Sequence, residues 1–593
     1  MSVTQNRFPQ QPATTSAATP FSYSVWGGWV YAVVGTLVPV AALVWAWTTI
    51  AVNVPKWDDH ALKAFLIALE NETSPLGWFR QVVKQHNEHR IAYDRLLTWV
   101  DYSVFGKLSF KRLMIYGDLS LLALVGLFGV LLRRYIKPWY LFLPPVAFFI
   151  ISLAQWENFY WALSSIQNFS IVVWSLACLY VLTHRANIGW AIGLATVATL
   201  VSGNGFLIWP IGLVLLLAQR RFKLLIPWSI AAVVLIAVYF GDYVQPTTHP
   251  ATRGSFLELA GGCLAFLGAA AEALPTANPY GLSQLLGGTL LLYWLVVFGR
   301  SLPAILAKKS WTPLQAFGLG ALAFMVGTAL VVVWGRFGYG RDTLLTSRYR
   351  IYSLTLLALT YCYCLSVYYK NNPVSPKQAW SWAIAGLFAS GLLWWSAFRL
   401  NTHESISLRK MLLTGQYNWT YTTNLPVSTL DATTRRLTDN SPAFYDASLA
   451  AFFGSAQGTP FPIDSVYKTN QSYRIQLGSD AQAAGVVPSL IRPDAGLNVV
   501  LRSAKRTYLF GALPTPRRHW RVLLNLLPLY PADQQLEAVI PTIEIDAGTY
   551  QVSVVLCSPE HPKGIVRPTN QLLTAAPHQL ATGPAYRGPA KNW

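Results

Sequence analysis

The chain has 593 residues, of which 53% are hydrophobic and 14% aromatic, while only 12% are charged. This composition excludes a series of soluble domains over the first two thirds of the chain and indicates a membrane protein with many spans. The net charge of +20 does not indicate nucleic-acid binding, because much of the basic excess lies in short loops between apolar segments, where membrane orientation accounts for it.

Eleven apolar segments approach the length of about 20 residues that crosses a bilayer. They cover residues 28–50, 114–133, 138–155, 165–183, 188–202, 206–219, 224–241, 281–299, 314–335, 351–369 and 379–398. Residues 256–273 form another long apolar stretch, but it has an acid near each end and two glycines between them. Whether this stretch crosses the membrane must be decided from the charges of the loops.

Cytoplasmic loops collect Lys and Arg, which orients the spans. If the N-terminus is inside and residues 256–273 are re-entrant or interfacial, the inner loops contain twelve basic residues and no acid. These are Arg133, Arg134, Lys137, Arg185, Arg220, Arg221, Lys223, Arg300, Lys308, Lys309, Lys370 and Lys377. A crossing by residues 256–273 would move five of them outside. We therefore predict a mainly α-helical polytopic bundle of eleven spans, with residues 1–25 as a disordered cytoplasmic lead.

The first outer loop, residues 54–113, is too polar to cross the membrane and too apolar to be disordered. Apolar residues recur at helical spacing in 61–69, 75–83 and 91–100, so we expect three short interfacial helices. Asp58 and Asp59 stand at its start. Two adjacent carboxylates repel each other, so the pair lowers stability unless a ligand uses it. One of them could act as a general base; alternatively, one caps the helix that begins near Ala61.

A second polar group in this loop is Asn87-Glu88-His89-Arg90. An acid and an imidazole beside the aspartates make Glu88 and His89 further candidates for proton transfer, and Arg90 a candidate for substrate binding. The alternative is a solvated turn between two of the interfacial helices.

Aromatic and amide residues gather at the outer ends of later spans. Trp156, Glu157 and Asn158 lie in one run, Gln167 follows, and Asn204 lies between two glycines. Aromatic faces bordered by amide and carboxylate groups suit a sugar ring. The aromatic belt of a bilayer interface would explain the rings, but not the acid and the amide.

Arginines are concentrated in a late outer loop, against the rule that keeps basic residues inside. They include Arg341, Arg348 and Arg350, with Tyr349 between the last two. Guanidinium groups bind phosphate bidentately, and a phospholipid-like donor presents phosphate at this depth. The alternative is pairing with anionic headgroups or with Asp342.

Residues 399–593 are polar, with short alternating runs at 472–477, 499–503, 507–510, 520–526 and 548–556. These runs predict strands, and we expect an extracytoplasmic β-sandwich-like domain. The five cysteines form neither a disulfide framework nor a zinc-binding spacing.

Many spans, an acidic pair in the first outer loop and an external soluble domain resemble the GT-C superfamily of membrane glycosyltransferases. The motifs Asn87-Glu88-His89-Arg90, Trp156-Glu157-Asn158, Gly203-Asn204-Gly205 and Ser347-Arg348-Tyr349 are also similar to those of bacterial polytopic membrane proteins.

The resemblance covers most of the chain and implies a GT-C-like domain at 26–398 in a bacterial inner membrane. It implies that Asp58 or Asp59 is the catalytic carboxylate and that the outer arginines hold the phosphate of a polyprenyl-linked sugar donor. The acceptor would be a glycan, a lipid or a protein. No cofactor is expected, and participation of a divalent cation stays open.

Two alternatives remain at this point. A surface-polysaccharide polymerase or ligase would depend more on Arg341 and His89 than on Asp58. A non-catalytic transporter or assembly factor should carry polar residues inside its spans, where this sequence offers little besides Asp118.

Overall fold

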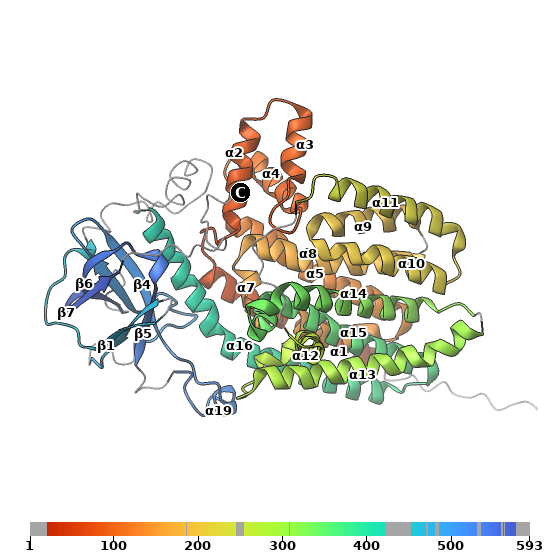
Figure 1. Ribbon diagram of the computed structural model, residues 1–593. Helices are drawn as coiled ribbons and strands as arrows, with labels where there is room; N and C mark the ends of the chain where they lie inside the picture. Colours follow the sequence, from red (N-terminus) through yellow and green to blue (C-terminus); the bar gives the residue numbers. More distant parts are fainter. Residues whose placement is uncertain are drawn as a thin grey trace, which may run out of the picture.

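The computed structural model describes residues 21–185, 187–244, 254–307, 309–420, 452–469, 472–480, 486–530, 535–558, 561 and 564–576. Helices make up the described chain to residue 420, and an antiparallel sheet dominates the part that follows. The helical bundle and the sheet lie at opposite ends of the molecule in Figure 1, joined by helix α16.

Within the described residues, nine helical segments are long and apolar enough to cross a membrane. They contain α1 (Phe21–Ile50), α5 (Phe110–Tyr135), α6 (Leu143–Ile150), α8 (Ala162–Tyr180), α11 (Leu225–Phe240), α13 (Pro279–Leu306), α14 (Pro313–Arg336), α15 (Arg350–Asn371) and α16 (Pro376–Thr420). Two shorter apolar helices, α9 (Ile188–Val201) and α10 (Ile208–Ala218), occupy the remaining two predicted segments. The chain therefore has the helices of a multi-pass membrane protein, as predicted.

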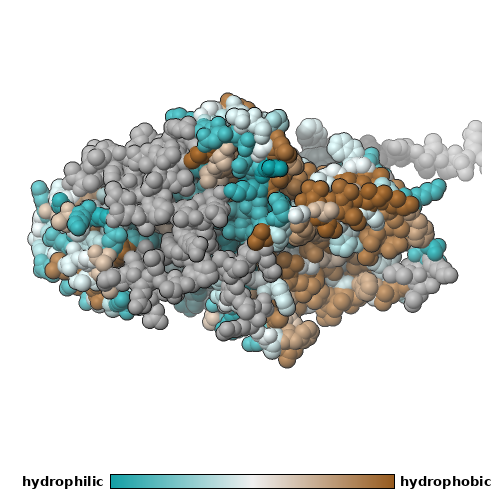
Figure 2. Space-filling view, turned by 45° about the horizontal axis from the view of Figure 1, so that its top comes forward, coloured by the Kyte–Doolittle hydropathy of each residue, from teal (hydrophilic) through white to brown (hydrophobic). Residues whose placement is uncertain are grey.

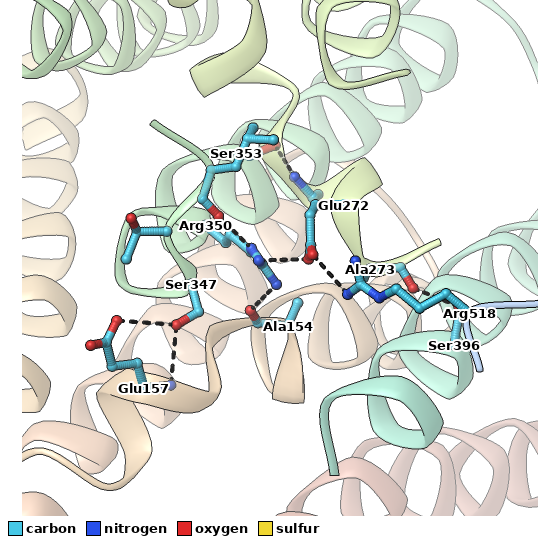
Figure 3. Close-up of polar contacts among 12 residues, drawn as sticks. Ala154, Glu157, Glu272, Ala273, Ser347, Arg350, Ser353, Ser396 and Arg518 are labelled. Carbon is cyan, nitrogen blue, oxygen red and sulfur yellow. Dashed lines mark hydrogen bonds and ion pairs between the residues drawn. The ribbon is translucent and has the colours of Figure 1, made fainter. Parts of the chain in front are cut away.

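Helix α12 (Phe256–Leu267) explains why residues 256–273 have an ambiguous sequence. A capping box between Ser255 and Glu258 starts the helix, which has 12 residues. At 1.5 Å per residue it is about 18 Å long, well short of the hydrocarbon thickness of about 30 Å. A 3-10 turn follows over Ala269–Ala273 and carries Glu272, which is paired with Arg350 and Arg518 (Figure 3).

The first outer loop contains three short helices, as the periodicity predicts: α2 (Asp59–Glu70), α3 (Pro75–Val83) and α4 (Ala92–Phe105). Ser74 starts α3 by accepting a hydrogen bond from the amide of Gly77, and Gly106 ends α4 with φ of +70°. Figure 1 shows the three helices projecting from one end of the bundle. Phe79, Val104 and Phe105 are exposed on them, which leaves an apolar surface for a headgroup region.

The described residues of the C-terminal domain form seven strands in one antiparallel sheet, in the order β1-β2-β5-β4-β3-β6-β7. The strands are β1 (Ile463–Lys468), β2 (Ser472–Leu477), β3 (Gly496–Arg502), β4 (Thr507–Pro514), β5 (Leu536–Pro541), β6 (Gly548–Cys557) and β7 (Ile565–Ala575). The sequence predicted two packed sheets, whereas β5 pairs with both β2 and β4 and thereby joins all described strands into one.

One predicted strand, at 520–526, is wrong, because Trp520–Leu523 forms the short helix α19. His519 accepts a hydrogen bond from the amide of Arg521, and the carbonyl of Leu523 accepts one from the indole of Trp395. These contacts hold α19 against α16 rather than in the sheet.

Helix α16 continues without a break past residue 399, where the sequence suggested a domain boundary, and ends at Thr420. Its last turns contact the sheet: the amide of Asn418 donates to the carbonyl of Leu509 and accepts from its N–H. Arg409 pairs with Asp494 at 2.7 Å. Figure 2 shows hydrophobic surface over the helical bundle and hydrophilic surface beside it, toward the C-terminal domain. The predicted lead, residues 1–25, lies mostly outside the described residues.

Candidate active site

A cavity of about 430 Å³ lies where the first outer loop meets one end of the bundle. Its walls come from the start of α8, the ends of α9, α11 and α14, and the turn before α15. Seven residues that the sequence singled out line it, although they come from four distant parts of the chain: Asp58, Glu88, His89, Gln167, Asn204, Arg348 and Tyr349.

The two adjacent aspartates have different surroundings. Asp59 is fully buried, and its carboxylate accepts hydrogen bonds from the amides of Lys56 (3.0 Å) and Leu163 (2.8 Å). Asp58 lines the cavity with 37% of its side chain exposed. It stands at the N-cap position of α2, but its side chain makes no capping bond. Of the two carboxylates, Asp58 is thus the one that can reach a ligand.

The local backbone separates the two carboxylates. Trp57, just before Asp58, has φ of +41°, a left-handed conformation that is rare for a bulky residue and recurs at functional sites. The indole of Trp57 packs edge-on against Trp161, with ring centroids 5.4 Å apart. Trp57 thereby fixes the path of the chain into α2.

A tight turn carries the second acidic group. The backbones of His86 and His89 exchange two hydrogen bonds, of 2.7 and 2.9 Å, around Asn87 and Glu88. Asn87 has φ of +49°, which asparagine tolerates better than most residues. The turn brings His86 Nε2 within 3.6 Å of the Asp58 carboxylate.

His89 faces the cavity from the same turn. Burial lowers the pKa of its imidazole, so His89 is neutral at pH 7 and can accept a proton. Its Nδ1 is buried and has no hydrogen-bond partner among the described residues. A Cβ at Gly203 would lie only 2.9 Å from this nitrogen, so the predicted glycine motif serves close packing here.

Two arginines reach the cavity from the late outer loop and the end of α14. Arg336 forms an ion pair with Glu88. Arg348 places its guanidinium over the rings of Trp161 (5.6 Å) and Tyr349 (5.3 Å), and its buried Nε has no hydrogen-bond partner in the described part of the chain. A guanidinium stacked in this way keeps donors available for an anion.

Amide side chains complete the polar wall. Asn204 donates to the hydroxyls of Thr328 (3.2 Å) and Tyr352 (2.9 Å), which leaves its Oδ1 without a partner among the described residues. Gln167 donates to the carbonyl of Val201 at 3.4 Å. The two side chains offer hydrogen-bonding groups beside the aromatic rings, as a hydroxylated ligand requires.

One side of the cavity is apolar and reaches the surface of the bundle. Val331 and Trp334 of α14 and Phe240 of α11 line the cavity and are 51%, 69% and 48% exposed. These side chains belong to the surface that a bilayer would cover. The cavity therefore connects polar groups to the region where a lipid chain would lie.

The other predicted residues do not line this cavity. Arg90 is held by Asp242, by the carbonyl of Tyr239 (2.7 Å) and by that of Val83. Asn158 lies behind the wall, where it donates to the carbonyl of Arg348 at 3.1 Å and accepts from Ser164.

Trp156, Glu157 and Arg350 line a second, smaller cavity. Arg341 stacks over the ring of Tyr280 at 5.4 Å. The concentration of arginines in this loop therefore has more than one structural cause.

Several cavity residues were not among the predicted site residues. Trp161 contributes a ring to the wall, and Lys56 holds Glu157 at 2.7 Å with its ammonium 4.4 Å from the Trp161 ring. Arg336 and His86 also line the cavity and were not predicted, although His86 directly precedes the Asn87-Glu88-His89-Arg90 group. Its position two residues before Asp58 was the only sequence signal for Lys56. Tyr239 and Tyr352 carry no signal beyond being aromatic residues in or near a span.

The described residues contain no group of three or more His, Cys, Asp or Glu side chains with the geometry to hold a metal ion. No protein-family model, no curated protein and no solved structure matches the chain. The function therefore has to be argued from the chemistry of the cavity.

Proposed function

We propose that this protein is a membrane glycosyltransferase that moves a sugar from a polyprenyl-phosphate-linked donor to an acceptor on the extracytoplasmic face. One observation carries the proposal: a single cavity joins the carboxylate of Asp58, the guanidinium of Arg348 and the exposed apolar side chains of α11 and α14. A lipid-linked sugar phosphate needs all three, because it has a long hydrocarbon chain, an anionic phosphate and a sugar carbon that the acceptor attacks.

In this proposal Asp58 is the general base. It takes the proton from the hydroxyl or amine of the acceptor as that group attacks the anomeric carbon of the sugar. The bond between this carbon and the phosphate oxygen breaks, and the polyprenyl phosphate leaves with the electron pair. Because only one displacement occurs, the anomeric configuration would be inverted.

The remaining residues bind the donor. Arg348 and Arg336 hold the phosphate, where the negative charge grows as the bond breaks. Tyr349 packs against the sugar, Asn204 and Gln167 bind its hydroxyls, and Trp161, whose ring contacts Lys56 and Arg348, holds Arg348 in position. The prenyl chain would leave the cavity between Phe240 and Trp334 and enter the bilayer.

The orientation is part of the proposal. We place eleven spans in a bacterial inner membrane, with a cytoplasmic N-terminus, α12 not crossing, and the cavity and C-terminal domain outside. The supporting observations are the acid-free basic loops on one side and the length of α12. The described ends of these loops meet, since Arg133, Lys137 and Val374 line one cavity at the end of the bundle.

The test is replacement of Asp58 by Asn in the purified full-length protein, followed by transfer from polyprenyl-phosphate sugars. We expect the rate to fall by about 10²- to 10⁴-fold, the usual contribution of a general base, with the thermal unfolding temperature unchanged. Glu72, a partly exposed acid of the same loop that lies outside the cavity, provides the matched control: Glu72→Gln should keep the full rate. Full activity of Asp58→Asn would refute the role of the carboxylate.

A polysaccharide ligase remains the second candidate because His89 faces the same cavity and is neutral there. In that case His89→Gln would abolish transfer while Asp58→Asn would reduce it only slightly. The same two variants therefore separate the two functions.

A further inference from the structure

A second cavity, of about 330 Å³, lies on the other side of the turn Ser347–Tyr349. Four acids line it, from four separate elements: Glu157, Glu272, Asp342 and Glu404. Asn401 of α16 and Arg350 of α15 complete the polar lining. Figure 3 shows Glu157 in contact with Ser347, and Arg350 in contact with Glu272.

The basic groups in and around this cavity are already engaged. Arg350 pairs with Glu272 at 2.6 Å and donates to the carbonyls of Ala154 (2.9 Å) and Leu345 (3.1 Å). Arg518, from the C-terminal domain, binds the other oxygen of Glu272 at 2.7 Å (Figure 3). Arg350 therefore has little capacity left for an anionic ligand.

Only two of the four acids are paired with basic groups. Lys56 neutralises Glu157, and Arg350 and Arg518 together exceed the single charge of Glu272 by one. Asp342 and Glu404 form no ion pair within the described part of the chain. The four acids and the three basic groups Lys56, Arg350 and Arg518 leave one net negative charge, which favours a cationic ligand over an anionic one.

Asn401 gives the independent evidence that a ligand is missing. It is 1% exposed, and neither its Nδ2 nor its Oδ1 has a hydrogen-bond partner among the described residues. A buried amide with both groups unsatisfied costs free energy, and such groups call for an explanation in a folded protein. A ligand with both a donor and an acceptor would satisfy it.

We propose that this second cavity binds a small hydroxylated amine, such as an amino sugar. Its ammonium group would lie against Glu404 and Asp342, and its hydroxyls would bind the amide of Asn401. The size is suitable, since small-molecule sites begin at about 300 Å³. An organic ammonium also fits better than a metal ion, because the carboxylates in the described residues are not clustered as a metal requires. The site does not depend on the transferase function proposed above.

The test is calorimetric titration of the full-length protein in nanodiscs with D-glucosamine and, as the neutral counterpart, D-glucose. We expect saturable binding of glucosamine and at least tenfold weaker binding of glucose. Glu404→Gln and Asn401→Ala should each raise the Kd for glucosamine about tenfold, the usual effect of losing a buried charged or amide contact. Asp58→Asn, in the first cavity, should keep the Kd within twofold even if it abolishes transfer.

Asp342→Asn makes the test independent of folding, because Asp342 is exposed and its replacement should not change the unfolding temperature. It should raise the Kd for glucosamine severalfold. Equal binding of glucose and glucosamine, no saturable binding of glucosamine, or an unchanged Kd in all three second-cavity variants would each overturn the proposal.

Discussion

At the scale of the residue, neighbours in sequence have separate tasks. Asp59 is buried and satisfied by two backbone amides, whereas Asp58 is open to the first cavity. Arg348 and Arg350 divide in the same way, since Arg348 stacks in the first cavity and Arg350 is tied into the wall of the second. One member of each pair holds the structure and the other is available to a ligand.

The burial of Asp59 makes stability depend on pH. Burial raises the pKa of its carboxyl from 3.8 to about 7. The folded state then binds this proton more tightly than the unfolded state, so the stabilisation is complete below about pH 4 and is lost as the pH rises through 7. Its size is of the order of 4 kcal/mol.

Replacing Asp59 by Asn should remove this dependence. In detergent, the unfolding temperature of the wild type minus that of the Asn variant should be larger at pH 5 than at pH 7.5. Asp94 is also buried with a raised pKa, and burial, the largest cause of that shift, is the same in both proteins. An equal difference at both pH values would contradict the buried, protonated state of Asp59.

Arg348 is proposed to bind the donor phosphate through its planar guanidinium. Arg348→Lys keeps the charge but loses the planar fork and the ring stacking, so we expect kcat/KM for the lipid-linked donor to fall about 10- to 100-fold. Steady-state kinetics at varied donor concentration measure this. Arg341→Lys is the matched control, outside the cavity, and should stay within twofold. Equal losses in both variants would mean that the effect is not specific to the cavity, and no loss in either would mean that the loop acts only through its charge.

At the scale of the element, the cavity depends on the close approach of α5 and α8. A Cβ at Gly117 would lie 2.1 Å from Ser165 Oγ and 2.4 Å from the Ser165 carbonyl carbon. The same hydroxyl donates to the carbonyl of Met114 (3.1 Å) and lies 3.0 Å from the Asp118 carboxylate. Small residues at helix crossings allow such contact in membranes, and here the crossing positions Ser164 and Gln167 at the cavity.

Gly117→Ala should therefore force the helices apart, at a cost of about 1–3 kcal/mol, and lower the apparent unfolding temperature. Gly126→Ala, on the same helix with no atom within 4 Å of the added Cβ, should be neutral or stabilising by up to about 1 kcal/mol. Thermal unfolding of both variants gives the comparison. A Gly117→Ala protein as stable as Gly126→Ala would contradict the packing.

At the scale of the whole molecule, the bundle and the C-terminal domain are joined by a helix and by charge. Helix α16 passes from one to the other without interruption, and Arg518 reaches from the domain to Glu272 beside α12. Arg409 of α16 binds Asp494 of the domain and the carbonyls at the end of α1. Both connections place the domain at the end of the bundle where the two cavities lie.

Orientation is the prediction that belongs to this scale. Alkaline phosphatase, which needs disulfides and so an oxidising compartment, should be active when fused to the end of the chain. It should be inactive when fused after Asn372, in a basic loop that we propose to be cytoplasmic. If residues 256–273 crossed the membrane, the two results would be exchanged. The same pair of fusions therefore settles the role of α12.

Much of this architecture can be predicted from the residues and their spacing along the chain. An apolar run of about 20 residues has little choice but to form a helix in a bilayer, and periodicity in the first outer loop is enough to place α2, α3 and α4. The sequence also identifies Asp58, His89, Asn204 and Arg348 as candidate site residues, because polar groups at the ends of spans lower stability unless a partner or a ligand binds them. These inferences need only the residues and their spacing.

Tertiary structure decided which of these groups meet. On a helical turn, consecutive residues are rotated by about 100° and alternate residues by about 200°, so neighbouring aspartates and alternate arginines face different surroundings once a wall is packed beside them. No pattern along the chain specifies that wall, because it is built from Trp161, Gly203 and the ends of α11 and α14, which are far apart in sequence. Tertiary structure also decided how the strands pair, because β5 joins β2 to β4 in one sheet, and the alternating runs predict strands without their partners.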